Sequence, residues 1–360
     1  MRIRLNKIHN GLLVLLQANK PFPLDKILII PYIFFLYTCK HIKFSKIESL
    51  ILGVLFFAAT LSFVINYPNG NIQIYYPIFF LSAGLLAAHS KIDLITVRKI
   101  LSFNIIFGLG ATIAAFLGFE NEFSYSLREK MLPYIYAPYG FSPTQQVYGT
   151  FCILIQIISF EYKKYDWLFI ISLICMILTL NRCTLLFFGI LLLVYKRKYF
   201  ISLCIAGITF IITYWEIISS IMFSTTTLES REDLRKGAKI SFWESHNAIV
   251  YLFGRGNTNT TEGIASKTYW ERTYIEHGLD FLLHCYGYIG LTIIVLLMLG
   301  FIFKFIKKKQ FGYAILTIYY LMMEPFFTHE FLASSFFYFI LIIIHLSKNQ
   351  SKKQLQTITI

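Results

Sequence analysis

Residues suited to binding an anion are concentrated in one polar segment, 220–284. Arg231 and Arg235 lie four residues apart, so on a helix they share one face and their planar guanidinium groups can clamp an anionic group. The alternative is a solvated helix face on which Glu232 and Asp233 balance the arginines. The segment is too long and too polar for a simple connection, which favours a binding or catalytic role.

A second group of ionisable residues ends the same segment. Glu276, His277, Asp280 and His284 lie within nine residues, directly before an apolar run. On a helix, Asp280 lies close to both Glu276 and His277. A carboxylate or a neutral imidazole is suited to take the proton of a hydroxyl group, and we predict this catalytic role for Glu276, His277 and Asp280. The alternative is a polar helix cap, with His284 in the core.

Arg182 separates two apolar runs, 165–181 and 183–195, with almost no connecting residues. A charge at such depth in a membrane is unfavourable unless it faces a cavity or a partner. The alternative is an interfacial arginine whose long side chain snorkels to water. Arg182 is the best single candidate for stabilising a negative charge.

The elements that must position these residues are predicted to be membrane-spanning helices. The sequence is 56% hydrophobic and 14% charged, whereas soluble globular proteins have about 25% charged residues. Its mean hydropathy is +0.61. Apolar runs recur from Leu12 to Leu346 with one long interruption. The composition therefore excludes an ordinary soluble domain and predicts an all-α integral membrane protein.

The predicted spans number about 11–12, at roughly 20 residues a crossing. They lie near 24–39, 48–66, 72–89, 99–118, 143–160, 165–181, 183–195, 199–219, 285–303, 310–323 and 331–346, and the short run Gly11 to Ala18 is a candidate twelfth. The predicted organisation is a membrane region 1–219 with a medium external loop at 119–142, a large periplasmic loop 220–284, and a last membrane region with a cytoplasmic tail, 285–360.

The distribution of basic residues predicts the orientation. Most of the 33 lysines and arginines fall in alternate short segments that share a side with the N-terminus. By the positive-inside rule, both termini are cytoplasmic and the large loop is external. The formal charge of +14 does not indicate a nucleic-acid partner, because the charges sit at the ends of apolar spans.

The sequence predicts no metal and no cofactor. The six cysteines fall in or beside apolar runs and have neither CxxC nor His/Cys ligand spacing, so we expect buried thiols without disulfides or zinc. The large loop also lacks a pair of acids in a D-x-D arrangement. Glu232 and Asp233 are adjacent, and adjacent side chains point apart.

The order of several motifs resembles that of the O-antigen polymerase and O-antigen ligase superfamily. The first motifs are an arginine-containing stretch at 230–235, a tryptophan at Trp243 and a Phe-Gly-x-Gly sequence within 252–256. They are followed by a Glu-His stretch at 276–280 and a G-x-x-G-L sequence at 287–291. Two further stretches, 139–143 and 178–182, are similar to the family's Gly-x-Phe-x-Pro sequence and its Ser-Arg pair between close spans. The resemblance covers about residues 100–346.

The resemblance implies a metal-independent glycosyltransferase in the bacterial inner membrane. It would join undecaprenyl-diphosphate-linked oligosaccharide repeat units on the periplasmic face, with the lipid bilayer as its surroundings and a chain-length regulator and a flippase as candidate partners. In this interpretation the substrate diphosphate is bound by Arg182, Arg231 and Arg235, and sugar rings stack on Tyr269, Trp270 and Tyr274.

Two alternatives stay open. Ligases of the family usually have His-Asn before the closing G-x-x-G, and the sequence Glu276-His277-Gly278 departs from that pattern, which favours a polymerase. The other alternative is a flippase or another transporter. Few ionisable residues lie within the predicted spans and no internal repeat is visible, and both observations weaken the transporter hypothesis.

Overall fold

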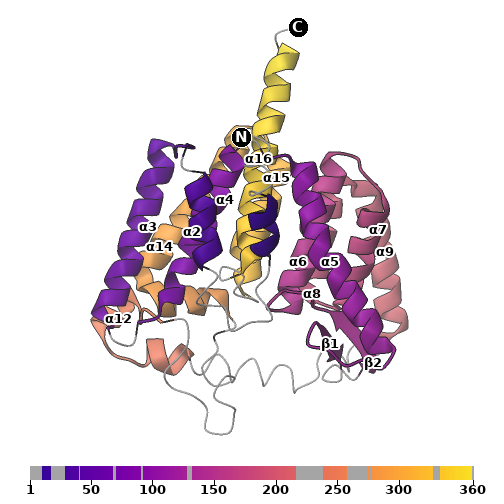
Figure 1. Cartoon of the computed structure of the whole chain (residues 1–360), viewed down its shortest axis with the longest axis horizontal. Coiled ribbons are helices and arrows are strands. Elements are labelled where there is room, and N and C mark those ends of the chain that lie inside the picture. Colours follow the sequence, from indigo (N-terminus) through magenta and orange to yellow (C-terminus); the bar gives the residue numbers. More distant parts are fainter. Residues whose placement is uncertain are drawn as a thin grey trace. The chain divides into compact units, whose positions relative to one another are not determined.

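The computed structural model describes residues 10–17, 29–39, 41–67, 70–90, 92–127, 132–215, 238–257, 275, 277–326 and 333–358 (Figure 1). Within these ranges the chain is mostly helical. Every apolar run that was predicted as a span overlaps a helix. The number of membrane crossings and their orientation stay predictions.

The helices follow the chain in a simple order. They are α2 (Ile29–Thr38), α3 (Lys46–Ile65), the 3-10 turn η2 (Ile72–Tyr75), α4 (Tyr76–His89), α5 (Leu94–Phe116), α6 (Gln145–Glu161), α7 (Trp167–Leu178), α8 (Arg182–Tyr195), α9 (Arg197–Thr213), the π-helix η4 (Lys239–Trp243), α12 (Ala248–Phe253), α14 (Gly278–Lys307), α15 (Phe311–Ile318), the π-helix η5 (Tyr319–Met323), the 3-10 turn η6 (Glu324–Phe326) and α16 (Ser334–Ile358).

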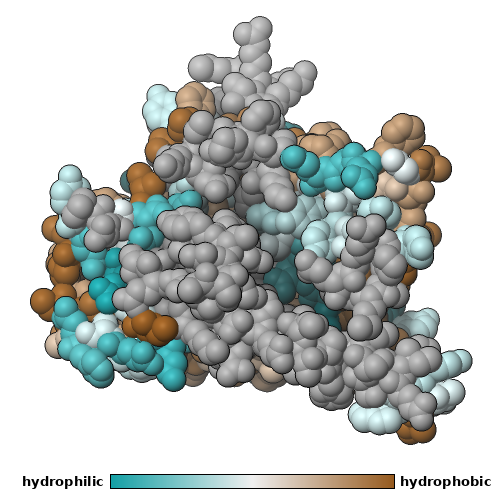
Figure 2. Space-filling model, turned by 90° about the horizontal axis from the view of Figure 1, so that it is seen from below, coloured by the Kyte–Doolittle hydropathy of each residue, from teal (hydrophilic) through white to brown (hydrophobic). Residues whose placement is uncertain are grey.

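Four of the described helical stretches are long and apolar enough to cross a membrane: Lys46–Ile65, Ile72–His89, Leu94–Phe116 and Gly278–Lys307. Large apolar side chains on α3 are exposed, among them Leu50 and Phe57, each 67% accessible. On the side of the molecule where α3 and α12 lie, Figure 2 shows hydrophobic residues along the outer flank, with hydrophilic residues beside them. Such surfaces suit contact with lipid, as expected for a helical membrane protein.

One element departs from the all-α prediction. Strands β1 (Ser124–Leu127) and β2 (Leu132–Pro138) pair in antiparallel register within the predicted external loop 119–142. Both strands contact α5. The six cysteines are free, and five are buried as predicted, whereas Cys204 on α9 is exposed.

The chain folds into two compact units. The first comprises 1–44, 79–195 and 333–360, and the second comprises 45–78 and 196–332. In the first unit α6 is the central helix, because α5, α7, α8 and α16 all pack on it and nearly all its side chains are buried. In the second unit α14 packs on α3, α12 and α15.

The stretch 139–143, one of the motifs behind the family resemblance, is held by a buried side chain of α5. Asn104 Oδ1 accepts a hydrogen bond from the backbone N–H of Phe141 at 2.8 Å, and Asn104 Nδ2 donates to Ser142 Oγ at 3.0 Å. Asn104 and Ser142 are both inaccessible to solvent. This motif therefore orders the chain ahead of α6, which is a structural role.

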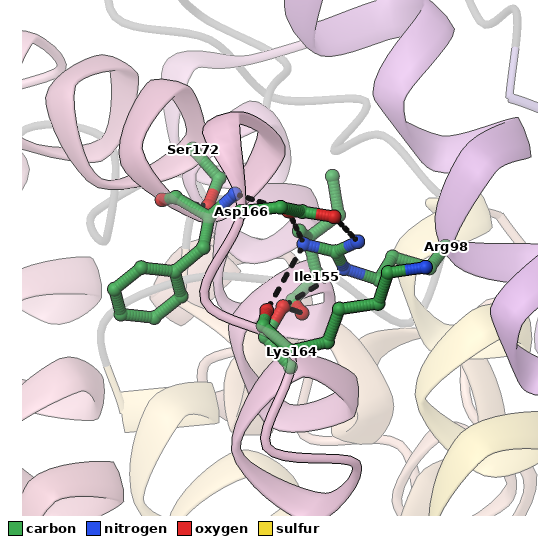
Figure 3. A network of polar contacts seen from close by, with 7 residues as sticks. Arg98, Ile155, Lys164, Asp166 and Ser172 are labelled. Carbon is green, nitrogen blue, oxygen red and sulfur yellow. Dashed lines mark hydrogen bonds and ion pairs between the residues drawn. The ribbon is translucent and has the colours of Figure 1, made fainter.

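A buried arginine joins α5 to the turn between α6 and α7 (Figure 3). Arg98 is 1% accessible, and its Nε donates to Ser159 Oγ at 2.8 Å. Its Nη1 donates to Asp166 Oδ2 at 2.9 Å, and its Nη2 pairs with Asp166 Oδ1 and donates to the Lys164 carbonyl at 3.4 Å. All three nitrogens of this guanidinium group therefore have protein partners.

We expect Asp166→Asn to lower the free energy of unfolding by about 3 kcal/mol, because it leaves the charge of Arg98 buried without a counter-ion. Thermal unfolding in detergent micelles compares the variant with the wild type.

Asp93→Asn is the matched control. Asp93 caps α5 as Asp166 caps α7, and asparagine caps a helix equally well. The control should unfold like the wild type, and equal stability of the two variants would contradict a stabilising role for the Arg98–Asp166 pair.

Candidate active site

Helix α14 is broken at Gly287, whose φ of 64° and ψ of −169° are not helical. The break divides α14 into a short segment, 278–286, and a long segment, 288–307. The predicted span began at 285, whereas the helix begins at Gly278. The long segment alone has about the 20 residues that a membrane crossing needs.

The break leaves backbone carbonyls of α14 without partners in the helix, and the loop after α12 forms hydrogen bonds with them. The carbonyls of His284 and Cys285, which lie before the break, accept hydrogen bonds from the N–H groups of Arg255 at 2.6 Å and Gly256 at 3.2 Å. Ser62 Oγ of α3 also donates to the Cys285 carbonyl, at 2.7 Å. Buried backbone carbonyls need such partners, so the loop and the break form one unit of structure.

Helix α3 and the turn after it hold the other side of the loop. Asn66 Nδ2 donates to the Gly254 carbonyl at 3.0 Å, and the backbone N–H of Asn71 donates to the Gly256 carbonyl at 2.8 Å. The loop therefore lies between α3 and α14, and Figure 1 shows α12, which precedes the loop, at one end of α3.

Two glycines allow this close approach. Gly254 and Gly287 have φ values of 75° and 64° with extended ψ, a conformation that is essentially restricted to glycine. A Cβ on Gly254 would lie 2.6 Å from the Cys285 carbonyl oxygen, and a Cβ on Gly287 would lie 2.5 Å from the Gly254 nitrogen. These glycines belong to the Phe-Gly-x-Gly and G-x-x-G-L sequences, so the structure brings two of the resemblance motifs into contact.

We expect Gly287→Ala to lower the free energy of unfolding by at least about 2 kcal/mol, because the backbone conformation alone costs about 1–3 kcal/mol in a non-glycine residue. The control is Gly300→Ala in the same helix, where a Cβ meets no atom within 4 Å. It should raise the free energy of unfolding by about 0.5–1 kcal/mol. Denaturant unfolding in micelles compares the two, and equal effects would mean that the break does not depend on glycine.

A ring of hydrogen bonds fixes Arg255 beside the break. Arg255 is half-buried, and its Nε donates to the Ser241 carbonyl of η4 at 2.9 Å. Ser241 Oγ lies 2.8 Å from His284 Nε2, and His284 Nδ1 lies 2.9 Å from the Asn257 carbonyl. A carbonyl only accepts hydrogen bonds, so Nδ1 carries the proton and donates, and in the neutral ring Nε2 accepts from the serine.

His284 therefore has a structural role. The residue is 1% accessible, and both ring nitrogens have hydrogen-bond partners. The interpretation of His284 as a core residue agrees with these contacts. A proton acceptor for a substrate must come from another residue.

His277 and Asp280, two of the three predicted catalytic residues, lie against each other at the start of α14. His277 Nδ1 is 3.1 Å from Asp280 Oδ2 and 3.2 Å from the Asp280 backbone nitrogen. An unprotonated Nδ1 accepts from the backbone N–H and caps the helix, whereas a protonated Nδ1 donates to the carboxylate. The side chains are 11% and 20% accessible, so the pair is largely shielded from water. The helix cap and the imidazole–carboxylate pair are therefore alternative states of the same nitrogen.

Arg182 is the first residue of α8, in the other compact unit. The turn before it is short because Asn181 caps α8: its Oδ1 accepts from the backbone N–H groups of Cys183 at 2.9 Å and Thr184 at 3.2 Å. The side chain of Arg182 is exposed, and no residue in the described ranges forms a hydrogen bond or an ion pair with it. Arg182 is thus available to an anion.

Several predicted residues fall outside the described residues. They are Arg231 and Arg235 of the diphosphate clamp, Glu276 of the catalytic group, and the aromatic residues Tyr269, Trp270 and Tyr274. Their assignments remain predictions.

Sequence reasoning missed Arg255 and Ser241. Arg255 is the variable residue of the Phe-Gly-x-Gly sequence, and the motif by itself assigns no role to it. The signal that could have found it is an arginine between two glycines, because glycines mark close backbone approach. Nothing in the sequence around Ser241 indicates that it contacts His284, 43 residues away.

Comparison with protein-family models and with curated protein sequences finds no match to this chain.

Proposed function

We propose that the protein is a polysaccharide polymerase of the bacterial inner membrane. It joins undecaprenyl-diphosphate-linked oligosaccharide repeat units into O-antigen or a related surface polysaccharide on the periplasmic face. The contact between His277 and Asp280 is the observation that carries the proposal, because an imidazole backed by a carboxylate is suited to deprotonate a sugar hydroxyl. The apolar helices suit a lipid-linked substrate.

The reaction needs one proton acceptor and a stabilised leaving group. The acceptor hydroxyl oxygen attacks the anomeric carbon of the lipid-linked donor, and the bond from that carbon to the diphosphate oxygen breaks. In the tautomer that donates Nδ1–H to Asp280 in place of the cap hydrogen bond, Nε2 is free of a proton. The hydroxyl proton passes to His277 Nε2, and Asp280 stabilises the imidazolium that forms. The electron pair leaves with undecaprenyl diphosphate.

The developing negative charge on the diphosphate requires cations. Arg182 is assigned to this role by its position in the sequence, between two apolar runs. Arg231 and Arg235 are assigned to the same role by their spacing alone. With arginines serving as the counter-charge, the proposed reaction requires no metal ion.

The topology completes the proposal. Both termini are cytoplasmic and the segment 220–284 is external, by the distribution of lysine and arginine. A flippase for the lipid-linked units and a chain-length regulator are the proposed partners. Tyr269, Trp270 and Tyr274 are assigned to stacking on sugar rings.

Deletion of the gene, followed by gel electrophoresis of the cell's lipopolysaccharide, tests the proposal. A band of core plus one repeat unit is expected for loss of a polymerase. Complete loss of the O-chain with accumulation of lipid-linked polymer would instead indicate a ligase, the nearer alternative. An unchanged ladder of bands would contradict the assignment to O-antigen.

A further inference from the structure

Arg98 and Arg255 differ in how many nitrogens of the guanidinium group have partners within the protein. In Arg98, Nε, Nη1 and Nη2 all have protein partners, including both oxygens of Asp166. In Arg255 only Nε has a side-chain contact, with the Ser241 carbonyl at 2.9 Å. No residue in the described parts of the chain pairs with Nη1 or Nη2 of Arg255. Arg98 is therefore a structural arginine, and Arg255 presents two donor groups that the described residues do not use.

The position of Arg255 is nevertheless fixed. Its backbone N–H donates to the His284 carbonyl, its Nε to the Ser241 carbonyl, and the side chains of Ser241 and His284 contact each other at 2.8 Å. Gly254 and Gly256, on either side of Arg255, are both buried. Their carbonyls accept hydrogen bonds from α3 and from the turn after it. A side chain held in this way loses little conformational freedom when it binds a ligand, which raises affinity.

The location links this arginine to the proposed catalytic pair. Arg255 contacts the short segment of α14 at His284, one helical turn after Asp280 and two after His277. Along the helix axis these separations are on the order of 6 and 10 Å. A substrate on this segment can therefore meet a base at one end and a cation at the other.

We propose that Arg255 binds the diphosphate of the lipid-linked substrate through its two terminal nitrogens, with Ser241 and His284 as positioning residues. This inference rests on the proposed function. A planar guanidinium group with both terminal nitrogens available matches the paired oxygens of a phosphate. No carboxylate in the described residues occupies that position.

Protection from chemical modification tests the proposal on the wild-type protein. The protein is placed in nanodiscs of zwitterionic lipid and treated with phenylglyoxal, and labelled arginines are quantified by mass spectrometry. Farnesyl diphosphate should slow the labelling of Arg255 at least fivefold, whereas farnesol should not. The control is Arg197, an exposed arginine at the start of α9, whose labelling should not change.

Two outcomes would overturn the proposal. Equal labelling of Arg255 with and without farnesyl diphosphate would exclude diphosphate binding. The experiment is repeated in nanodiscs that contain anionic phospholipid. Full protection of Arg255 by that lipid, with no further effect of farnesyl diphosphate, would show that Arg255 binds bilayer headgroups instead.

A variant provides the second measurement. Arg255→Lys keeps the charge but loses the planar fork, so the Kd for farnesyl diphosphate should rise at least tenfold. An unchanged Kd would contradict the proposal. If the protein binds farnesyl diphosphate but does not polymerise repeat units, the proposed function is wrong and the diphosphate site at Arg255 is retained. If it polymerises repeat units but Arg255 is not protected, the proposed function is retained and the site at Arg255 is wrong.

Discussion

Replacing His277 with asparagine is expected to reduce polymer formation by about 10²- to 10⁴-fold, the usual contribution of a general base. Asparagine keeps the helix cap, because it is among the best N-cap residues, but its amide cannot take a proton at neutral pH. The effect should therefore appear in polymer yield and not in the abundance of the protein in the membrane. Gel analysis of lipopolysaccharide together with an immunoblot of membranes measures both quantities.

His246→Asn is the matched control for this variant. His246 lies in the same predicted external segment, is exposed, and has a φ of 48°, which asparagine accommodates well. Its substitution should leave the polymer unchanged. Normal polymer from His277→Asn would remove His277 from catalysis and leave it with the role of a helix cap.

Replacing Arg182 with alanine is the second change with a large expected effect. Loss of one donor that stabilises a developing charge typically lowers a rate by about 10²- to 10³-fold. Arg182→Lys should restore only a small part of the activity, because an ammonium group keeps the charge without the two-pronged geometry. Chain extension in cells that produce equal amounts of each variant measures the effect.

Arg197→Ala controls for the loss of an exposed arginine at the start of a helix, since Arg182 and Arg197 are the first residues of α8 and α9. It should extend chains normally. If Arg182→Ala did the same, Arg182 would be an interfacial arginine that snorkels to water.

The positions of the helices could be predicted from the sequence because long apolar runs leave few alternatives to a helix in a membrane. The start of α14 and its break could not be predicted in this way. Asp280 and His284 lower the hydropathy of the short segment, so the predicted span began at 285. The break itself depends on the backbone conformation of Gly287, and a glycine three residues before another glycine is equally compatible with an unbroken helix.

The candidate site could be predicted only where its contacts are local. His277 and Asp280 meet because they are three residues apart on one helix, a spacing that is visible in the sequence. The ring of Ser241, Arg255 and His284 joins three separate elements, and no sequence period connects them. The β1–β2 hairpin was not predicted from the sequence, because β2 contains two prolines, which are uncommon in strands.

The most direct test of the central claim is polymerisation by the purified protein. The protein is reconstituted in liposomes with undecaprenyl-diphosphate-linked repeat units extracted from the deletion strain, in excess EDTA, and the products are separated on a gel. The proposed arginine-assisted reaction predicts a ladder of longer chains in the chelator. Repeat units that stay single, with folded protein present, would contradict the assignment as a polymerase, and a ladder that forms only when Mg²⁺ or Mn²⁺ is added would contradict the metal-independent mechanism.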